Sequence, residues 1–170
     1  CPLILGPDGA KFSKRHGAVG VEEFRKMGYL PEALSNYILR LGWSHGDEEI
    51  IPRERALEIF DLSGINKAAA KFDYAKLENL NAHYMKEKEP DELIELLSDY
   101  VDTPITSEIS NRIKPLLSEL VERAPTLVAL ADGCRFLIQD TPFDYDEKAQ
   151  KLLNDDATEM LKILKDTLEE

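Results

Sequence analysis

Apolar positions recur at helical spacing along most of the chain, so the sequence predicts a mainly α-helical protein. The clearest helix covers residues 31–41, with proline in its first turn and Gly42 just after its end. Asn36 is expected to lie outside its apolar face. That face consists of Leu34, Tyr37, Ile38 and Leu41. Further helices are predicted at residues 21–27, 52–60, 73–85, 91–101, 106–123 with a break at Pro115, 126–138, 146–153 and 157–168.

The first residues have a different pattern, which predicts a short β-hairpin. The apolar residues 2–5 are followed by the turn sequence G-P-D-G at residues 6–9, and residues 10–12 then form a second short stretch. The second strand of this hairpin is expected to lead directly into K-F-S-K-R-H-G at residues 11–17.

The balance of charge changes near a charged run at residues 86–90, which ends in proline. Residues 1–90 hold 13 lysine and arginine residues against 14 acidic ones, whereas residues 91–170 hold 8 against 19. We therefore expect one part at residues 1–89 and a second, helical part at residues 90–170. A polyanion such as RNA would be attracted to the first part. Its basic side chains gather at Lys11, Lys14, Arg15, Arg25 and Lys26, and again at Lys67, Lys71 and Lys76.

The composition is that of a globular protein and excludes several other classes. The chain has 170 residues, of which 43% are hydrophobic, and this is enough for a buried core. No apolar run approaches the roughly 20 residues of a membrane span, and the start lacks the pattern of a signal peptide. We therefore expect a soluble, cytoplasmic protein with no membrane partner.

Neither the cysteines nor the histidines are spaced as a metal or redox site. Cys1 and Cys134 are far apart, and Cys134 is expected to be a small core residue. Trp43 follows an amphipathic helix and is expected to pack in the core rather than to stack on a nucleotide. No metal site is predicted, because the three histidines are scattered. They are His16, His45 and His83.

The segment at residues 11–17 combines the residue types of a phosphate-binding loop. Lys11 and Lys14 supply mobile positive charges, Ser13 supplies a hydroxyl donor, and Gly17 lets the backbone approach a ligand closely. The Walker sequence G-x-x-x-x-G-K-[ST] is absent. Taken alone, a solvated basic loop is the commoner explanation of such a cluster.

This segment resembles the KMSKS signature of class I aminoacyl-tRNA synthetases in its glutamyl form, in which K-L-S-K-R-H-G is usual. Phe12 replaces the usual leucine or methionine, and Arg15 replaces the serine of the generic signature. The resemblance to bacterial glutamyl-tRNA synthetases continues through almost the whole chain. It is carried by V-E-E-F-R-K-M-G-Y-L-P-E-A-L at residues 21–34, N-Y at 36–37, L-G-W-S at 41–44, K-F-D at 71–73, K-L-E-N-L-N at 76–81, R-A-P-T-L at 123–127 and Y-D-E-K-A at 145–149.

The resemblance implies an ATP site at the first of these segments. Lys11, Ser13, Lys14 and Arg15 would bind ATP during glutamate activation, and Lys14 would be catalytic by holding the phosphates as pyrophosphate departs. Mg²⁺ would share in stabilising the charge that develops at the α-phosphate. That ion would be bound outside this chain, since no metal site is expected within it.

The resemblance also implies that the chain is a carboxy-terminal fragment of a longer enzyme. The nucleotide-binding domain of the family, with its HIGH-type motif, would precede residue 1. Residues 1–89 would comprise the end of the catalytic signature and a helical stem-contact region, and residues 90–170 would be a helical anticodon-binding domain that is truncated. This fragment alone is not expected to aminoacylate tRNA.

Transfer RNA is the implied partner, while ATP and glutamate would be bound with the help of the preceding domain. Lys67, Lys71 and Lys76 would meet phosphates at the inner corner of the tRNA, and Arg123 and Arg135 would contact nucleotides of the anticodon arm. Pairing with nearby acidic residues is the competing explanation for the two arginines, and a solvated face is the competing explanation for the lysines. Glutamate tRNA is the expected partner, glutamine tRNA stays open, and the family implies a monomer.

Three alternatives lead to different expectations. A free-standing, acidic helical protein-interaction module, with an incidental basic loop, is favoured by the acidic excess of residues 91–170 and would bind a protein partner without salt dependence. The related glutaminyl enzyme has an anticodon region built from β-barrels, whereas residues 91–170 are predicted to be helical. The shortened paralogue that modifies tRNA lacks this region altogether.

Overall fold

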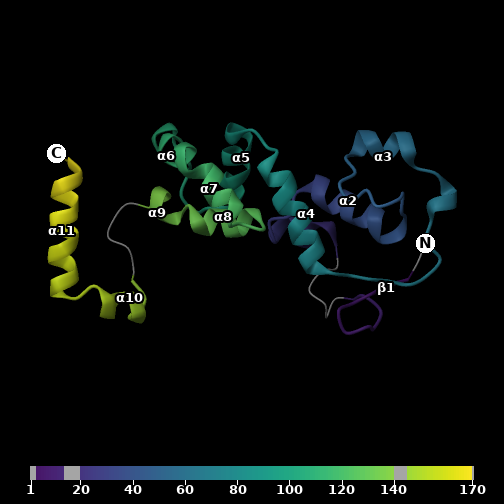
Figure 1. The fold of residues 1–170 in the computed structure, drawn as a ribbon, viewed down its shortest axis with the longest axis horizontal. Helices are drawn as coiled ribbons and strands as arrows, with labels where there is room; N and C mark the ends of the chain where they lie inside the picture. The colour runs from purple at the N-terminus through teal and green to yellow at the C-terminus, as the bar shows by residue number, and fades with distance from the viewer. Residues whose placement is uncertain (1–2, 14–19, 140–144, 170) are drawn as a thin grey trace. The chain divides into compact units, whose positions relative to one another are not determined.

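The computed structural model describes residues 3–13, 20–139 and 145–169, and it confirms a mainly α-helical fold (Figure 1). The chain forms two compact units, Cys1–Ile138 and Gln139–Glu170. The first unit contains the two described strands and the helices up to α9, and the second unit contains α10 and α11. Each unit is described by itself.

The elements closely follow the predicted helical segments. The strands are β1 (Ile4–Leu5) and β2 (Ala70–Lys71). The helices of the first unit are α1 (Val21–Lys26), α2 (Pro31–Gly42), α3 (Arg53–Ile59), α4 (Tyr74–Lys86), α5 (Pro90–Leu97), α6 (Ser107–Ile113), α7 (Leu117–Glu122), α8 (Leu127–Gly133) and α9 (Arg135–Ile138). Short 3-10 turns occur at η2 (Leu62–Gly64), η3 (Ser98–Tyr100) and η4 (Lys114–Leu116). The second unit holds α10 (Glu147–Leu152) and α11 (Asp155–Glu169).

Helix starts are set locally by capping side chains. In each case a side-chain oxygen accepts a hydrogen bond from a backbone N–H in the first turn, which otherwise has no partner within the helix. The capping residues of α4, α6, α8 and α10 are Asp73, Thr106, Thr126 and Asp146. Pro115 lies in the 3-10 turn η4 and separates α6 from α7, as its missing N–H requires.

The predicted hairpin is present as a turn closed by a single bridge, and β1 has a second partner that was not predicted. Leu5 forms an antiparallel bridge with Lys11 across the turn. On its other edge β1 pairs in parallel with β2, where Ile4 lies opposite Ala70 and Leu5 opposite Lys71. This pairing joins residues that are more than sixty positions apart in the sequence, so no local pattern indicates it.

The predicted inner face of α2 is correct at Leu34 and Tyr37 and wrong at Ile38, and Asn36 is buried although it was expected to lie outside this face. Ile38 is 51% exposed, whereas Asn36 is only 2% exposed. Asn36 can be buried because its amide makes three hydrogen bonds: Ile51 N and Tyr84 Oη donate to its Oδ1, both at 2.8 Å, and its Nδ2 donates to Glu49 O at 3.0 Å. Burial of a polar side chain is therefore offset by hydrogen bonds that the helical periodicity cannot reveal.

Two hydrophobic cores hold the first unit together, and the larger one contains side chains from both sides of residue 90. This core contains Leu30, just before α2, and Met85 on α4, together with residues of α5 to α9. In Figure 1, α4 runs beside α2, and it also packs against α7. The division of the chain at residue 90 stays a prediction. The smaller core is formed by Phe24, Tyr29, Leu34, Tyr37, Phe72 and Leu77.

The helix predicted at residues 126–138 is interrupted at Cys134, between α8 and α9. Its apolar face is nevertheless preserved, because Leu130, Cys134 and Ile138 are all buried. Burial raises the pKa of the Cys134 thiol to about 11, so the thiol stays protonated and unreactive at neutral pH. Trp43 is buried too, and its Nε1 donates to Asp61 O at 2.8 Å.

Gly28, just after the end of α1, lies directly against the start of α8. It has a φ of +84°, and its carbonyl oxygen accepts a hydrogen bond from Leu127 N at 2.9 Å. A Cβ atom on Gly28 would lie 2.6 Å from Val128 N and 2.9 Å from Leu127 N. Only glycine can combine this backbone conformation with this contact.

We expect Gly28→Ala to lower the free energy of unfolding by about 2 kcal/mol more than Gly9→Ala does. Gly9 is a matched control, because it has a similar φ of +79° but no atom within 4 Å of an added Cβ. Urea unfolding of both variants measures the difference. Equal losses of stability would show that the contact with α8 contributes nothing.

Candidate nucleic-acid interface

The described part of the K-F-S-K-R-H-G segment presents two polar side chains around one packed ring. Lys11 and Ser13 are exposed, whereas Phe12 is half-buried and its ring stacks on Phe72, with the ring centroids 4.7 Å apart. The bridge to Leu5 fixes the backbone at Lys11. The other two predicted ATP-binding residues, Lys14 and Arg15, lie outside the described residues.

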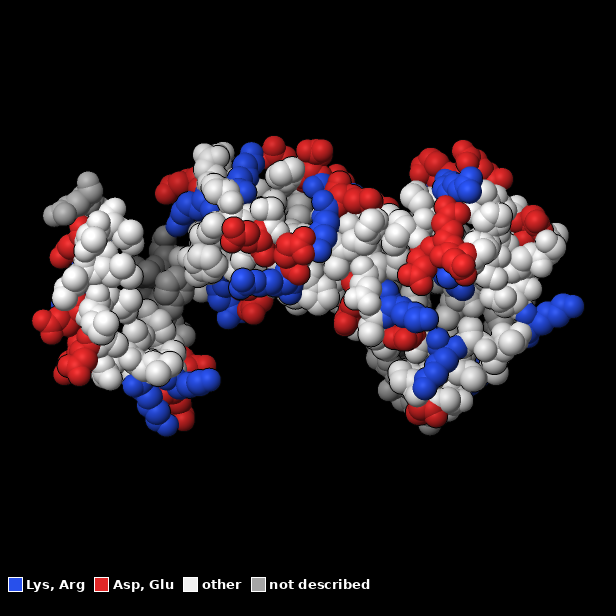
Figure 2. Space-filling model, viewed as in Figure 1, with Lys and Arg blue, Asp and Glu red and all other residues white. Residues whose placement is uncertain are grey.

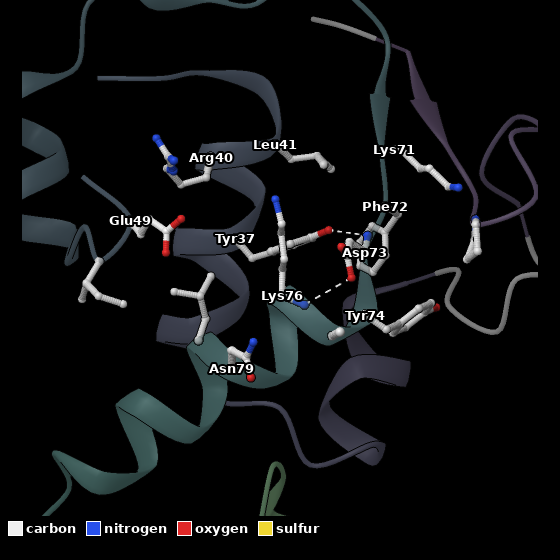
Figure 3. Close-up of a pocket in the computed structure, with 14 residues that line it drawn as sticks. Tyr37, Arg40, Leu41, Glu49, Lys71, Phe72, Asp73, Tyr74, Lys76 and Asn79 are labelled. Carbon is white, nitrogen blue, oxygen red and sulfur yellow. Dashed lines mark hydrogen bonds between the residues drawn. The ribbon is translucent and has the colours of Figure 1, made fainter. Parts of the chain in front are cut away.

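A cleft of about 1040 Å³ lies between α2 and the β2–α4 connection, and Phe72, on which Phe12 stacks, is part of its lining (Figure 3). Arg40 and Glu49 lie on one side of it in Figure 3, and Asp73 and Lys76 lie on the other. The lining is completed by Pro7, Tyr37, Leu41, Ile50, Lys71, Phe72, Tyr74, Ala75, Asn79 and Leu80. In Figure 3, the side chain of Lys76 extends from the first turn of α4. The side chain of Lys71 leaves β2 on the side away from Arg40.

Asp73 fixes the wall of this cleft by two hydrogen bonds. Its backbone N–H donates to the Tyr37 hydroxyl at 2.6 Å, and its Oδ1 accepts from Lys76 N at 3.3 Å, which caps α4 (Figure 3). Burial raises the pKa of the Tyr37 hydroxyl, so this group is neutral at physiological pH. The hydrogen bond therefore links α2 to the start of α4 without adding charge to the cleft.

The cations of the cleft differ from most of the basic residues around them. Within the part of the chain that the structure describes, Arg40, Lys71 and Lys76 make no ion pair. Several other basic side chains of the first unit are paired with acids: Arg25 with Asp99 at 2.9 Å, Lys26 with Glu23, Lys86 with Glu122, Lys88 with Glu32 and Glu92, and Lys114 with Asp91. In Figure 2, acidic side chains gather over α3 and α5, while the basic ones form separate small groups. An anion would therefore find unpaired cations at the cleft.

The remaining predicted contact residues are spread over the first unit. Lys67 is exposed and does not line the cleft, so only Lys71 and Lys76 of the predicted trio are brought together. Arg123 is exposed at the end of α7, and within the described residues it makes no ion pair. Arg135 begins α9 and pairs with Asp132 at 3.0 Å. Arg40 was missed, because it reaches the cleft only through the packing of α2 against α4.

No arrangement of side chains that could hold a metal ion is found among residues 3–13, 20–139 and 145–169. His45 stacks on Trp43, and His83 lies 3.1 Å from the carboxylate of Glu87, so neither belongs to a cluster of potential ligands. None of the described helices is both long and apolar enough to cross a membrane.

Comparison with known proteins covers nearly the whole chain. The family described as "tRNA synthetases class I (E and Q), catalytic domain" matches residues 1–79, and the family described as "Anticodon binding domain" matches residues 92–170. Glutamate–tRNA ligase 1 of Gluconacetobacter diazotrophicus is 49% identical over 94% of the chain, and glutamate–tRNA ligase of Bradyrhizobium diazoefficiens is 46% identical over 99%. The chain is homologous to one part of glutamate–tRNA ligases. It spans 35% of the length of the first of these ligases and 38% of the second.

Solved structures of glutamate–tRNA ligases have the same fold. The chain superposes on a ligase from Elizabethkingia meningosepticum, solved in complex with its amino acid, with a TM-score of 0.74 and 26% identity. The match covers 98% of the chain and 37% of that ligase. A ligase from Elizabethkingia anophelis gives a TM-score of 0.68 over 88% of the chain. The helical fold of this chain is thus that of one part of a glutamate–tRNA ligase.

Proposed function

We propose that the complete protein to which this chain belongs activates glutamate with ATP and ligates it to tRNA. The observation that carries this proposal is the 43% to 50% identity to glutamate–tRNA ligases that extends over nearly the whole chain, including residues 11–17. The chain itself would contribute the last part of the ATP site and a surface for tRNA. A direct test is ATP-dependent charging of glutamate tRNA by the complete protein.

The proposed ATP-binding residues are Lys11, Ser13, Lys14 and Arg15. During attack of the glutamate carboxylate on the α-phosphate, negative charge builds up on the departing pyrophosphate, and positioned cations stabilise it. Lys14 is proposed as the catalytic residue because a mobile lysine charge can follow the leaving phosphates. Mg²⁺ would be bound by the phosphates and by groups outside this chain, and would reduce the same charge.

The proposed tRNA surface comprises the cleft and the ends of two helices. Lys71 and Lys76, joined by Arg40, would hold backbone phosphates, which position a nucleic acid without reading its sequence. Arg123 would contact nucleotides of the anticodon arm, and Arg135 would do so after exchanging its ion pair with Asp132. Lys67 would make at most a peripheral phosphate contact.

We expect the double substitution Lys71→Ala and Lys76→Ala to weaken binding of glutamate tRNA about tenfold. It should also reduce the slope of log affinity against log salt by about two, because binding of the tRNA releases fewer counterions when two phosphate contacts are lost. Filter binding at several salt concentrations measures both quantities. Lys86→Ala is the control, since Lys86 lies on the same helix but is already paired with Glu122. An unchanged salt slope in the double variant would exclude the cleft as a phosphate site.

The choice of tRNA is a separate question with a direct test. We propose glutamate tRNA as the main substrate of a monomeric enzyme, with glutamine tRNA as a second acceptor to be tried. Charging of both purified tRNAs with glutamate, at equal concentration, distinguishes an enzyme that accepts one from an enzyme that accepts both. Sedimentation of the complete protein tests the monomer.

A further inference from the structure

Phe72 lies between the two proposed ligand sites and is buried to 4% exposure. On one side its ring stacks on Phe12, at 4.7 Å and an interplanar angle of 19°. On the other sides it meets Tyr37 at 4.9 Å and Phe24 at 5.8 Å. Stacked and edge-to-face rings at these distances attract one another beyond their burial, so Phe72 is the centre of a fixed aromatic cluster.

The two segments that meet in this cluster have the same alternating pattern. Phe12 packs inward while its neighbours Lys11 and Ser13 are exposed, and Phe72 is buried while Lys71 and Asp73 are exposed. In an extended backbone successive side chains point in opposite directions. The inward ring at position 12 therefore determines the direction in which the two polar side chains beside it leave the protein.

Both phenylalanines are attached to the same strand. Phe72 N donates to Leu5 O at 2.8 Å, and Phe12 N donates to Ile4 O at 2.9 Å. The backbones are thus aligned by β1, but position 12 has only a single bridge beside it, at Lys11. The stack on Phe72 holds the ring of Phe12 in orientation as well as in position.

We propose that Phe72 is a positioning residue for the ATP step, acting through Phe12 to hold Lys11 and Ser13 toward the phosphates. The inference rests on the proposed function, since it assumes that Lys11 and Ser13 bind ATP. Phe72 is buried and touches no reacting atom. Phe72 also lines the cleft, but the cations there are held by other contacts, Lys71 by the pairing of β2 with β1 and Lys76 by helix α4. Loss of the ring alone is therefore expected to leave the phosphate contacts of the tRNA in place.

Phe72→Leu in the complete protein tests this role, because leucine keeps an apolar side chain and removes the stack. We expect kcat/KM for ATP in ATP–pyrophosphate exchange, measured with glutamate and glutamate tRNA present, to fall about tenfold. The dissociation constant of the tRNA should stay within about twofold of its original value, which also shows that the variant is folded. Phe136→Leu is the control, because Phe136 is an exposed phenylalanine on α9.

A double-variant cycle with Phe12→Leu separates positioning from general damage. If Phe72 acts through Phe12, the double variant loses no more activity than Phe72→Leu alone. Losses that multiply, or a normal ATP step in Phe72→Leu, would overturn the proposal. Should Phe72→Leu fail to fold, Phe12→Leu at the half-buried partner carries the same prediction for ATP. Absence of exchange in the unmodified protein would instead contradict the proposed function itself.

Discussion

Lys14→Ala in the complete protein is expected to slow glutamate activation at least about a hundredfold. A lysine that follows the departing pyrophosphate stabilises charge that exists only in the transition state, so its loss lowers kcat far more than it weakens ground-state binding. ATP–pyrophosphate exchange with glutamate tRNA present measures the rate. Affinity for the tRNA should change by less than about threefold, since a single phosphate contact at most is lost.

Lys26→Ala is the matched control for this experiment. Lys26 is an exposed lysine that follows the same motif closely in the sequence, but it is paired with Glu23 at 2.8 Å. Its loss removes the same charge without removing a proposed ligand of ATP. Equal exchange rates in Lys14→Ala and the unmodified protein would refute the catalytic role of Lys14, and equally slow rates in both variants would point to net charge instead of a specific contact.

Asn81→Ala is expected to be the most damaging single substitution in the first unit, lowering the free energy of unfolding by about 3 to 5 kcal/mol. Asn81 lies on α4 and has no exposed surface. Its Oδ1 accepts from Leu30 N at 2.7 Å, and its Nδ2 donates to Pro125 O at 2.7 Å. Alanine would leave both backbone groups buried without a partner and would open a cavity, so several penalties act together.

Asn79→Ala separates this effect from the change in helix propensity that Asn→Ala brings, because Asn79 is an exposed asparagine two positions away on the same helix. Urea unfolding of both variants gives the comparison. We expect the Asn79 variant to stay within about 0.5 kcal/mol of the original protein. A similarly small effect at Asn81 would mean that water or local rearrangement satisfies Leu30 N and Pro125 O.

The helix ends could be predicted from the sequence, because they depend on residues that are close to them in the chain. Asp73 and Thr126 cap the helices that begin after them, and Gly28 lies where α1 has ended. Such signals act through hydrogen bonds and backbone conformations within one turn. The burial of Trp43 followed in the same way from its place after an amphipathic helix.

The parts that were missed depend on residues distant in the sequence. Asn36 was expected to lie outside the apolar face, but it is a core residue because its amide binds a backbone group of another segment, and Asn81 is buried for the same reason. The parallel pairing of β1 with β2 has the same origin. Helical periodicity depends only on which side chains are apolar. It therefore cannot predict the burial of a polar side chain whose hydrogen-bond partners are distant in the sequence.

In the candidate site, too, residues close in the sequence were predicted and distant ones were missed. Lys71 and Lys76 stand close in sequence and both line the cleft, so their charge pattern indicated a shared surface. Arg40 joins them only because α2 packs on α4, and Lys67 of the same basic stretch does not line the cleft. Which cations remain unpaired is likewise decided by folding, as the pairing of Arg25 with Asp99 illustrates.

The most direct test of the central claim is the transfer of labelled glutamate to purified glutamate tRNA by the complete protein, followed as acid-precipitable counts. We expect charging that requires ATP, is specific for glutamate and falls when Lys14 is replaced by alanine. No transfer under these conditions, together with salt-insensitive binding of a protein partner, would contradict it and would favour a helical interaction module.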